Sequence, residues 1–510
     1  MTMELEFDRN TMSYYETVTN MTACQEETLE SIVPDACPDI LRIVDVCGQA
    51  TLSSKQAKER TAVVSGMVRV TILYQPENSS GLRRMEVGIP FTCQVDAPNL
   101  TERGIVLASP RLRRAEARAL NPRKVLLRVD LAVDITACQP KERPICRGVL
   151  NEETNAICQR QFNGETYQLL SVQEKPFTFS EQVKLPAGQG EAPQIMAVRA
   201  EPYCTEHKLI GSKMILKGTV GLHMLLQEPS GNLSSSRESL PFSQILEVPG
   251  AEEGGDGQVS VELTDMQYEL NPADSRSIEV SMEFLAQVQV RCRRAVTLLQ
   301  DLYSTAWKTE VDGETQTLSR LGEQCTRSQG ARELLETGEM VRSVIDSRIA
   351  LGQMNQNRDG DQMVLSAECW LTVLYLDENN LVQCVRRTVP VSTRIDCPTG
   401  YQCSCVSRCP DDLFATPTAG GIEVRFTVEF QYLTISMYTV ASVKGGRLGE
   451  ARANHDGPQP SIVLRLAAPG EGIWEIAKAY GTTKEQILQA NELEQEDLPE
   501  EKMLLIPRMR

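Results

Sequence analysis

The sequence predicts a mainly β protein, in which three tandem antiparallel repeats, each a small sandwich or barrel, precede a β-α-α-β domain. Three observations support this prediction. One stretch of sequence occurs three times, at intervals of about 150 residues. Each copy also contains a long segment of alternating apolar and polar residues, which is typical of a strand with one buried face. The last part of the chain instead combines two helical patterns with two short apolar segments.

The first landmark of each copy is an apolar strand. Its three versions occupy residues 63–74, 214–226 and 363–375. Gly66 and Gly218 of the first two copies correspond to Ala367 in the third. A second landmark places an apolar residue before proline. Its three versions are Ile89-Pro90-Phe91, Leu240-Pro241-Phe242 and Val389-Pro390-Val391. Polar turn residues between the two landmarks predict that they form a hairpin.

A third landmark precedes the alternating strand of each copy. Its versions are Leu120-Asn121-Pro122, Leu270-Asn271-Pro272 and Ala415-Thr416-Pro417. The strands that follow begin near Leu127, Ile278 and Ile422 and alternate with period two. Landmarks that recur in one order indicate internal triplication, with the third copy the most divergent.

These landmarks give a set of expected boundaries. The three repeats are expected at residues 34–139, 191–292 and 336–441, and the last domain at 462–510. The intervening parts are expected to be an N-terminal segment (1–33), connecting strands (140–190), a connecting segment (293–335) and a flexible linker (442–461). Short helices are expected at 28–32, 39–44 and 331–344.

The last domain has two helix signals. Ile473, Ile476, Ala477 and Tyr480 share one helical face, and Gly481 can end that helix in a left-handed conformation. A second helix is expected to start at the capping-box residues Thr482 and Thr483 and to direct Ile487 and Leu488 inward before Asn491. Strands at 462–466 and 503–506 flank the pair.

Residues 462–508 resemble the LysM family. The resemblance lies in a Gly-acid-small-apolar-Trp run before Ile-Ala, an Asn after the second helix and a closing Leu-x-Ile-Pro. It implies a βααβ module that binds N-acetylglucosamine chains or a protein partner through its two loops. The residues expected at this site are Gly470, Glu471, Gly472, Ile473, Trp474, Asn491 and Leu493.

Two features of this site leave its ligand open. The usual Asp-Thr of the first loop is Glu471-Gly472 here, and the lost hydroxyl counts against glycan binding. Trp474 has two interpretations: a core residue of the module, or an aromatic anchor on its rim for a protein partner.

Residues 30–440 resemble the SPOCS domain of spore-coat-associated proteins. The three landmarks carry this resemblance, together with the opening Pro34-Asp35-Ala36-Cys37-Pro38-Asp39-Ile40. SPOCS repeats before a LysM domain resemble the SipL-type family of spore coat morphogenetic proteins. That resemblance implies a mother-cell protein at the forespore surface, which docks through LysM onto a coat morphogenetic ATPase and contacts other coat proteins.

The charge composition limits the classes of partner that are expected. The 510 residues carry a net charge of −17, which disfavours nucleic acid or an anionic membrane as the main partner. A basic cluster in the first copy is expected to be a solvated face rather than an anion-binding patch, because no aromatic residues are interleaved with it. Its members are Arg111, Arg113, Arg114, Arg118, Arg123, Lys124 and Arg128.

The N-terminus shows no basic segment followed by an apolar one, and no apolar run approaches membrane-spanning length. We therefore expect a cytoplasmic protein without membrane insertion. The sixteen cysteines are expected to be reduced thiols. The densest group lacks the paired spacing of common zinc sites, so we expect thiols rather than a metal site. Its members are Cys397, Cys403, Cys405 and Cys409.

The residues suggest no catalytic constellation and no cofactor motif. The histidines are His207, His223 and His455; His223 is expected on the outer face of its strand, and His455 in the linker. The glycine-rich run at 445–449 lacks the Lys-Ser/Thr of a nucleotide loop and is also interpreted as linker. The favoured function is an intracellular scaffold, the alternative a peptidoglycan-binding protein, and an enzyme is the least favoured class.

Overall fold

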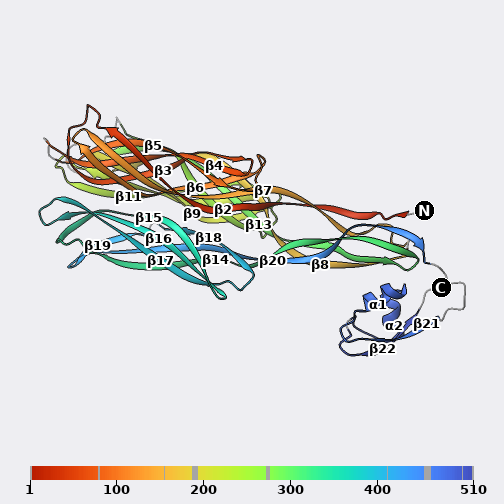
Figure 1. Ribbon diagram of the computed structural model, residues 1–510. Coiled ribbons are helices and arrows are strands. Elements are labelled where there is room, and N and C mark those ends of the chain that lie inside the picture. Colours follow the sequence, from red (N-terminus) through yellow and green to blue (C-terminus); the bar gives the residue numbers. More distant parts are fainter. Residues whose placement is uncertain are drawn as a thin grey trace.

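The computed structural model describes residues 3–77, 81–153, 156–185, 193–271, 276–410, 412–452, 461–496 and 498–507. Its strands form an elongated body that narrows into a stalk, and the two helices lie in a separate module at the end of that stalk (Figure 1). We define the stalk as residues 3–16, 140–153, 156–169, 292–320 and 436–452. The C-terminal module comprises residues 461–496 and 498–507. The mainly β architecture predicted from the sequence is confirmed.

Each copy begins and ends with a long strand. The first copy contains β2 (Phe7–Ile32), β3 (Ile40–Lys58), β4 (Thr61–Pro76), β5 (Arg83–Asp96), β6 (Ile105–Asn121) and β7 (Lys124–Val149). The second contains β8 (Ile157–Lys184), β9 (Gln194–Ile210), β10 (Lys213–Gln227), β11 (Leu233–Glu247), β12 (Asp256–Leu270) and β13 (Ser277–Ser304). The third contains β14 (Trp307–Leu335), β15 (Val341–Asp359), β16 (Gln362–Asp377), β17 (Val382–Asp396), β18 (Tyr401–Arg408), β19 (Phe414–Thr418) and β20 (Gly421–Ala451). The short β1 (Met3–Glu4) pairs with β20.

Every copy is a two-layer sandwich. The three strands after the first long strand form one antiparallel sheet: β3-β4-β5, β9-β10-β11 or β15-β16-β17. The long strands form the other layer, as β2-β7-β6, β8-β13-β12 and β14-β20 with β18 and β19 on β20. The first two of these layers join into one six-stranded sheet at Tyr15 and Leu169.

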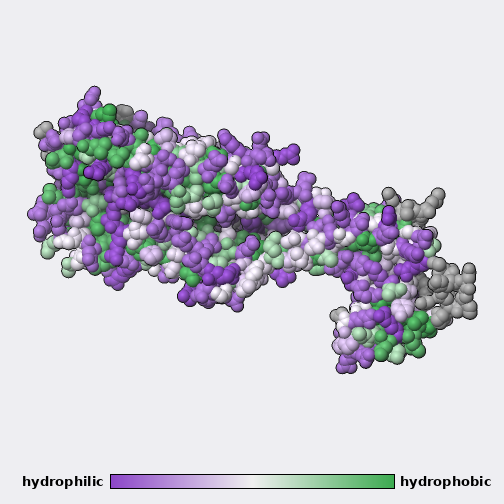
Figure 2. Space-filling view, in the orientation of Figure 1, coloured by the Kyte–Doolittle hydropathy of each residue, from purple (hydrophilic) through white to green (hydrophobic). Residues whose placement is uncertain are grey.

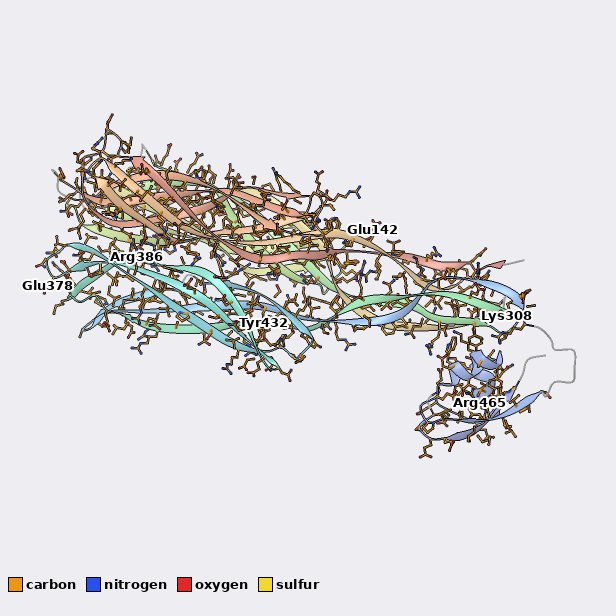
Figure 3. The ribbon with its side chains drawn as sticks, viewed as in Figure 1. Glu142, Lys308, Glu378, Arg386, Tyr432 and Arg465 are labelled. Carbon is orange, nitrogen blue, oxygen red and sulfur yellow. The ribbon has the colours of Figure 1, made fainter. Side chains whose placement is uncertain are left out.

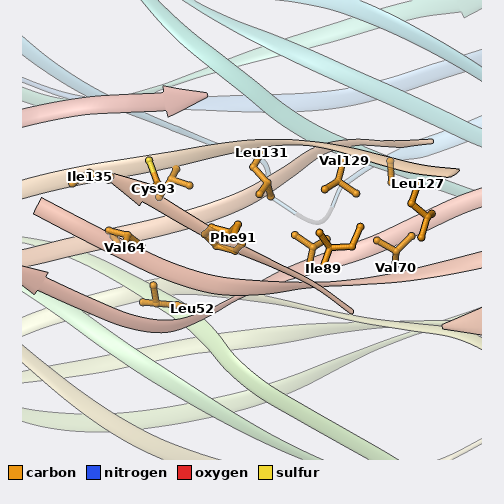
Figure 4. Close-up of a cluster of buried hydrophobic side chains, with 14 of the residues drawn as sticks. Leu52, Val64, Val70, Ile89, Phe91, Cys93, Leu127, Val129, Leu131 and Ile135 are labelled. Atoms are coloured by element: carbon orange, nitrogen blue, oxygen red, sulfur yellow. The ribbon is translucent and has the colours of Figure 1, made fainter. Parts of the chain in front are cut away.

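The core of each sandwich consists of the inward residues of both layers. In the first copy, Val64 and Phe91 come from one layer, and Leu127 and Leu131 come from the other (Figure 4). Equivalent clusters fill the second and third copies. The alternation seen in the sequence is therefore explained, because every second residue of these strands is withdrawn from water.

The divergence of the third copy has a packing explanation. Gly66 lies opposite Phe91, and an added Cβ would approach that ring to 2.4 Å. Gly218 and Phe242 have the same relationship. In the third copy alanine replaces the glycine, and Ala367 lies opposite Val391, whose side chain is smaller than that of phenylalanine. The methyl of alanine therefore partly compensates for the lost ring, as close-packed cores favour.

Charged residues join the copies around a pseudo-threefold axis. One set of equivalent positions, one in each copy, holds Asp45, Ala197 and Asp346, which pair with equivalent leucines of β4, β10 and β16. Two residues further along the chain, the same copies have Cys47, Arg199 and Arg348. Arg348 donates to Asp45 at 2.6 Å, and Arg199 donates to Asp346 at 3.2 Å. The corresponding contact between the first and second copies is apolar, because Cys47 and Ala197 belong to one hydrophobic cluster. Two buried ion pairs and one apolar contact are therefore among the interactions that join the three copies.

Several local predictions were wrong. Residues 28–32 and 331–335 lie in long strands, 40–44 lie in β3 and 341–344 lie in β15, so none of the three expected helices forms there. Their apolar spacing is too short to specify a period, and pairing with distant strands decides their conformation. The expected linker is also partly wrong, because residues 442–451, including the glycine-rich run, continue β20. Residues 453–460, with His455, lie outside the described residues, as does Pro272.

The C-terminal module has the predicted order of elements. Strands β21 (Ile462–Ala467) and β22 (Lys502–Pro507) pair antiparallel, and α1 (Ile473–Tyr480) and α2 (Lys484–Ala490) pack on one face of the pair. Gly481 ends α1 with a φ of 64°, and the Thr483 hydroxyl accepts the N–H of Gln486 at the start of α2. Among the described residues, no helix has the length and apolar character needed to cross a membrane.

Candidate functional site

Two loops of the C-terminal module meet at the start of α1. The Gly470 N–H donates to the Leu498 carbonyl at 2.8 Å, and the Ile473 N–H donates to the Glu496 carbonyl at 3.3 Å. Gly470 has a φ of 82°, which a non-glycine residue adopts only at a cost. The structure therefore joins the loop of Gly470 and Ile473 to the loop that follows α2.

Most of the site residues predicted from the sequence make hydrogen bonds or packing contacts within the C-terminal module. The Glu471 carboxylate accepts from Arg465 and from the Ala468 N–H, and Figure 3 shows Arg465 within the module. The Asn491 amide donates to Ile487 and Leu505 carbonyls at 2.8 and 2.7 Å and accepts the Leu505 N–H, so it joins α2 to β22. Ile473 is buried in the module core, and Leu493 packs against that core.

Trp474 is buried against the stalk. Only 4% of it is exposed. Its ring meets Tyr303 edge to face at 5.0 Å between centroids, and its indole N–H donates to the Asp301 carboxylate at 2.8 Å. Arg160 lies over the other side of the indole at 5.5 Å. The side chain therefore forms part of an interface between the module and the rest of the chain.

Asp301 is the centre of this interface. Lys478 of α1 donates to both of its carboxylate oxygens, at 2.7 and 2.8 Å. The neighbouring Tyr303 hydroxyl donates to the Thr482 carbonyl at 2.8 Å. A register shift between Leu299 and Asp301 marks a β-bulge, a device that re-aims side chains. The module is thus docked on the tip of β13.

The opposite face of the module is apolar and exposed. Leu464 is 66% exposed and lies directly across from the exposed Leu505. The other exposed members are Ile462, Leu466 and Met503. Hydrophobic surface is visible on this module in Figure 2. Contiguous apolar patches of this kind mark interaction sites.

Sequence reasoning missed this sheet face, although a signal for it was present. A two-stranded sheet covered on one side by helices should alternate apolar and polar residues. Instead, Val463 between Ile462 and Leu464, and Leu504 between Met503 and Leu505, make both faces apolar. One face of the β21-β22 sheet packs on the module core, and the other face is exposed.

The thiols and the two histidines of the described residues, His207 and His223, form no recognisable reactive centre. Burial raises the pKa of Cys403 to about 12 and that of Cys409 well above its usual value, which disfavours the thiolate. All sixteen cysteines are free thiols. No cluster suited to a metal ion occurs among the described residues. His223, expected to face solvent, is buried. Its cross-strand neighbours Arg199 and Arg237 both donate to residues of the third copy, which covers this part of β10.

The basic cluster of the first copy is only partly a solvated face. Arg128 is half-exposed, as expected. Arg111, Arg113 and Arg114, however, line a cavity between the copies, and the first two side chains are about four-fifths buried. Their expected position at the surface was wrong, because β6 faces the other copies along this stretch.

The fold and this binding surface define a repeat-built β protein with a small C-terminal binding module. Comparison with protein families identifies the domains: residues 39–120 and 191–271 match the SipL SPOCS domain, and residues 468–507 match the LysM domain. The chain therefore carries SPOCS domains followed by a C-terminal LysM domain, as the sequence resemblance predicted. No curated protein matches the chain.

These domain types indicate a spore-coat-related protein with a LysM binding module, and LysM domains suggest peptidoglycan binding. Both matched types are binding domains, and neither is a catalytic family. The third copy is recognised from its structure, since β15, β16 and β17 repeat the pairing and burial pattern of β3, β4 and β5.

Proposed function

We propose that the protein is a non-enzymatic scaffold of spore coat assembly, located in the mother cell at the forespore surface. Its LysM domain docks onto a coat morphogenetic ATPase, and its SPOCS copies contact other coat proteins. The observation that carries this proposal is the exposed apolar sheet face of a LysM domain in a chain of SPOCS domains.

The geometry supports contact with a protein surface. The exposed side chains of β21 and β22 stand on a rigid two-stranded sheet, and their cross-strand register makes them one patch. Apolar residues grouped at the centre of a polar surface are the usual anchors of protein interfaces. Docking of α1 on the stalk turns this patch away from the body, where a partner can reach it.

The alternative is binding of peptidoglycan glycan. The LysM match and the meeting of its two loops favour it. Against it, the Glu471 carboxylate is already engaged by Arg465 and by a backbone N–H. A glycan would have to replace these contacts or use backbone groups alone.

The test compares full-length variants in affinity capture from sporulating cells, with the captured ATPase identified by mass spectrometry. Leu464→Thr combined with Leu505→Thr removes the centre of the patch and keeps strand-forming residues. We expect at least a tenfold loss of captured ATPase. Ile245→Thr is the matched control, because Ile245 is also an exposed strand residue, 52% accessible, but lies in the second copy.

Equal capture by the double variant and the control would remove the sheet face from the proposed site. Binding of the full-length protein to purified peptidoglycan, lost on Glu471→Ala and retained in the Leu464 and Leu505 variant, would favour the glycan alternative instead.

A further inference from the structure

A cavity lies where the three copies meet. Its volume is about 850 Å³, within the range of small-molecule sites. Its walls come from β3, β6, β9, β12, β15 and β18, together with parts of neighbouring strands, so every copy contributes. The cavity is separate from the LysM domain and plays no part in the proposed docking.

The wall is rich in arginine. Among the described residues, the arginines that line it are Arg111, Arg113, Arg114, Arg199, Arg348, Arg386, Arg387 and Arg408. The acidic residues that line it are Glu116, Asp134, Glu201 and Glu262. Burial raises the pKa of Glu262 to about 7, so part of this opposing charge is absent at neutral pH.

Several donors of this wall are left without an acceptor. Arg111 is paired with Asp134, Arg113 with Glu368 and Arg199 with Asp346. Yet the Nε–H of each of these three arginines is buried and has no hydrogen-bond partner within the described ranges. The buried Ser407 hydroxyl on the same wall is also without one. A buried donor that stays unpaired costs about 1–3 kcal/mol, so such a set favours added acceptors. Each of these atoms is closed off from solvent, so an anion in the cavity reaches it only if the side chain shifts toward the cavity.

The chemistry of the missing acceptor follows from the donors. Guanidinium groups only donate, carry full positive charge and bind carboxylate or phosphate oxygens best. We propose that the cavity binds a small multivalent oxyanion, a di- or tricarboxylate or an oligophosphate, through Arg111, Arg113 and Arg199. Because these arginines come from two copies, and Arg199 is paired with the third, the bound anion joins all three copies.

Trp370 gives this site an optical signal. Its ring lies on the cavity wall, 5.8 Å from the Arg113 guanidinium and 5.7 Å from that of Arg114. An anion that draws these guanidiniums away from the ring changes the surroundings of the indole. The chain has only two other tryptophans, Trp307 and Trp474, and neither lines the cavity.

The experiment titrates the full-length protein with tripolyphosphate and, separately, with citrate, by isothermal calorimetry at low ionic strength, with acetate as the monovalent control. We expect saturable binding of at least one multivalent anion to one site, a change in tryptophan emission over the same concentrations, and no saturation with acetate. The two probes distinguish a phosphate ligand from a carboxylate ligand.

Two variants test the wall. Arg113→Gln and Arg111→Gln should each weaken binding at least tenfold. Both should fold, because Glu368 keeps its bond from the Trp370 indole and Asp134 keeps its bond from Thr22. Arg332→Gln is the matched control, since Arg332 is also paired with a carboxylate but lies at the surface, and it should change affinity less than twofold.

Glu262→Gln should not lower the anion affinity, unlike the two arginine substitutions. It removes an acidic group from the cavity, so affinity should stay equal or rise, whereas general damage to the cavity would lower it. Failure of both multivalent anions to saturate, or equal affinity of Arg113→Gln and Arg332→Gln with circular dichroism spectra unchanged, would overturn the proposal.

Discussion

The indole N–H of Trp474 donates to the carboxylate of Asp301 at 2.8 Å, across 173 residues of sequence. This one carboxylate also receives the ammonium of Lys478, so a tryptophan and a lysine of α1 share an acceptor on the stalk. The contact fixes the LysM domain in one orientation and leaves its apolar sheet face outward. Asp301 therefore joins the LysM domain to the stalk.

Asp301→Ala should release the LysM domain. The substitution removes charge-assisted hydrogen bonds, a loss of about 2–3 kcal/mol in docking free energy. We expect a larger radius of gyration in small-angle X-ray scattering and a red shift of tryptophan emission as Trp474 meets water. Glu310→Ala is the control, because Glu310 is an exposed, ion-paired acid on the same stalk. A scattering curve identical to that of the control would contradict this role of Asp301.

Asp45 should make the body acid-sensitive. Burial alone would raise its pKa, but Arg348, Arg386 and the Cys384 thiol hold it at about 2, below the ordinary 3.8. Because the folded pKa is the lower one, the stabilisation is full above about pH 4 and is lost as the pH falls toward 2. The pKa difference corresponds to about 2 kcal/mol. Thermal unfolding followed between pH 5 and 2.5 should show this decline in the wild type and a smaller one in Asp45→Asn. An equal decline in thermal stability with pH for the wild type and Asp45→Asn would contradict this role of Asp45.

Glu262 should have the opposite pH dependence. Burial raises its pKa from 4.5 to about 7, against the opposing effects of Ser109, Arg408, Ser260 and Arg111. Its stabilising contribution is therefore present below pH 4.5 and is lost as the pH rises through 7. Glu262→Gln should be more stable than the wild type at pH 8, by up to about 3 kcal/mol, and should lose this advantage near pH 4.5. Urea unfolding at both pH values measures the difference, and an advantage independent of pH would refute the assignment.

Gly66 and Phe91 should be energetically coupled. Gly66→Ala places a Cβ 2.4 Å from the Phe91 ring and 2.2 Å from the Thr51 carbonyl, and overpacking of this kind costs about 1–3 kcal/mol. Phe91→Val alone leaves a cavity and also destabilises. The double variant recreates the pair found in the third copy, so it should be more stable than the sum of the two single losses, by about 1 kcal/mol. Strict additivity in chemical denaturation would show that the ring is not the obstacle.

Local features were predictable from the sequence. The caps at Thr483 and Gly481 and the recurring landmarks of the repeats depend on near neighbours, so spacing alone located α1, α2 and the repeated strands. The boundaries of the copies were harder to place. Segments 140–149 and 157–184 read as connections, yet they belong to β7 and β8, whose partners are far away in the sequence.

The site itself was only partly accessible to sequence reasoning. The order of strands and helices in the LysM domain was predictable, but the surroundings of Trp474 depend on Asp301 and Tyr303, which no pattern near residue 474 reveals. The pairing of Arg348 with Asp45 spans 303 residues for the same reason. Burial of Arg111 and Arg113 likewise results from the assembly of three copies, and the local sequence indicates only a basic segment.

The long strand β20 has a mechanical consequence. It runs without interruption from the core of the third copy to the tip of the stalk, just before the LysM domain, and it is bonded antiparallel to β14 over nearly its whole length. A pull on a tethered LysM domain loads these hydrogen bonds in shear, so many must break together before the sheet yields. The pairing of β14 with β20 should therefore resist a pull applied along β20 between the body and the LysM domain.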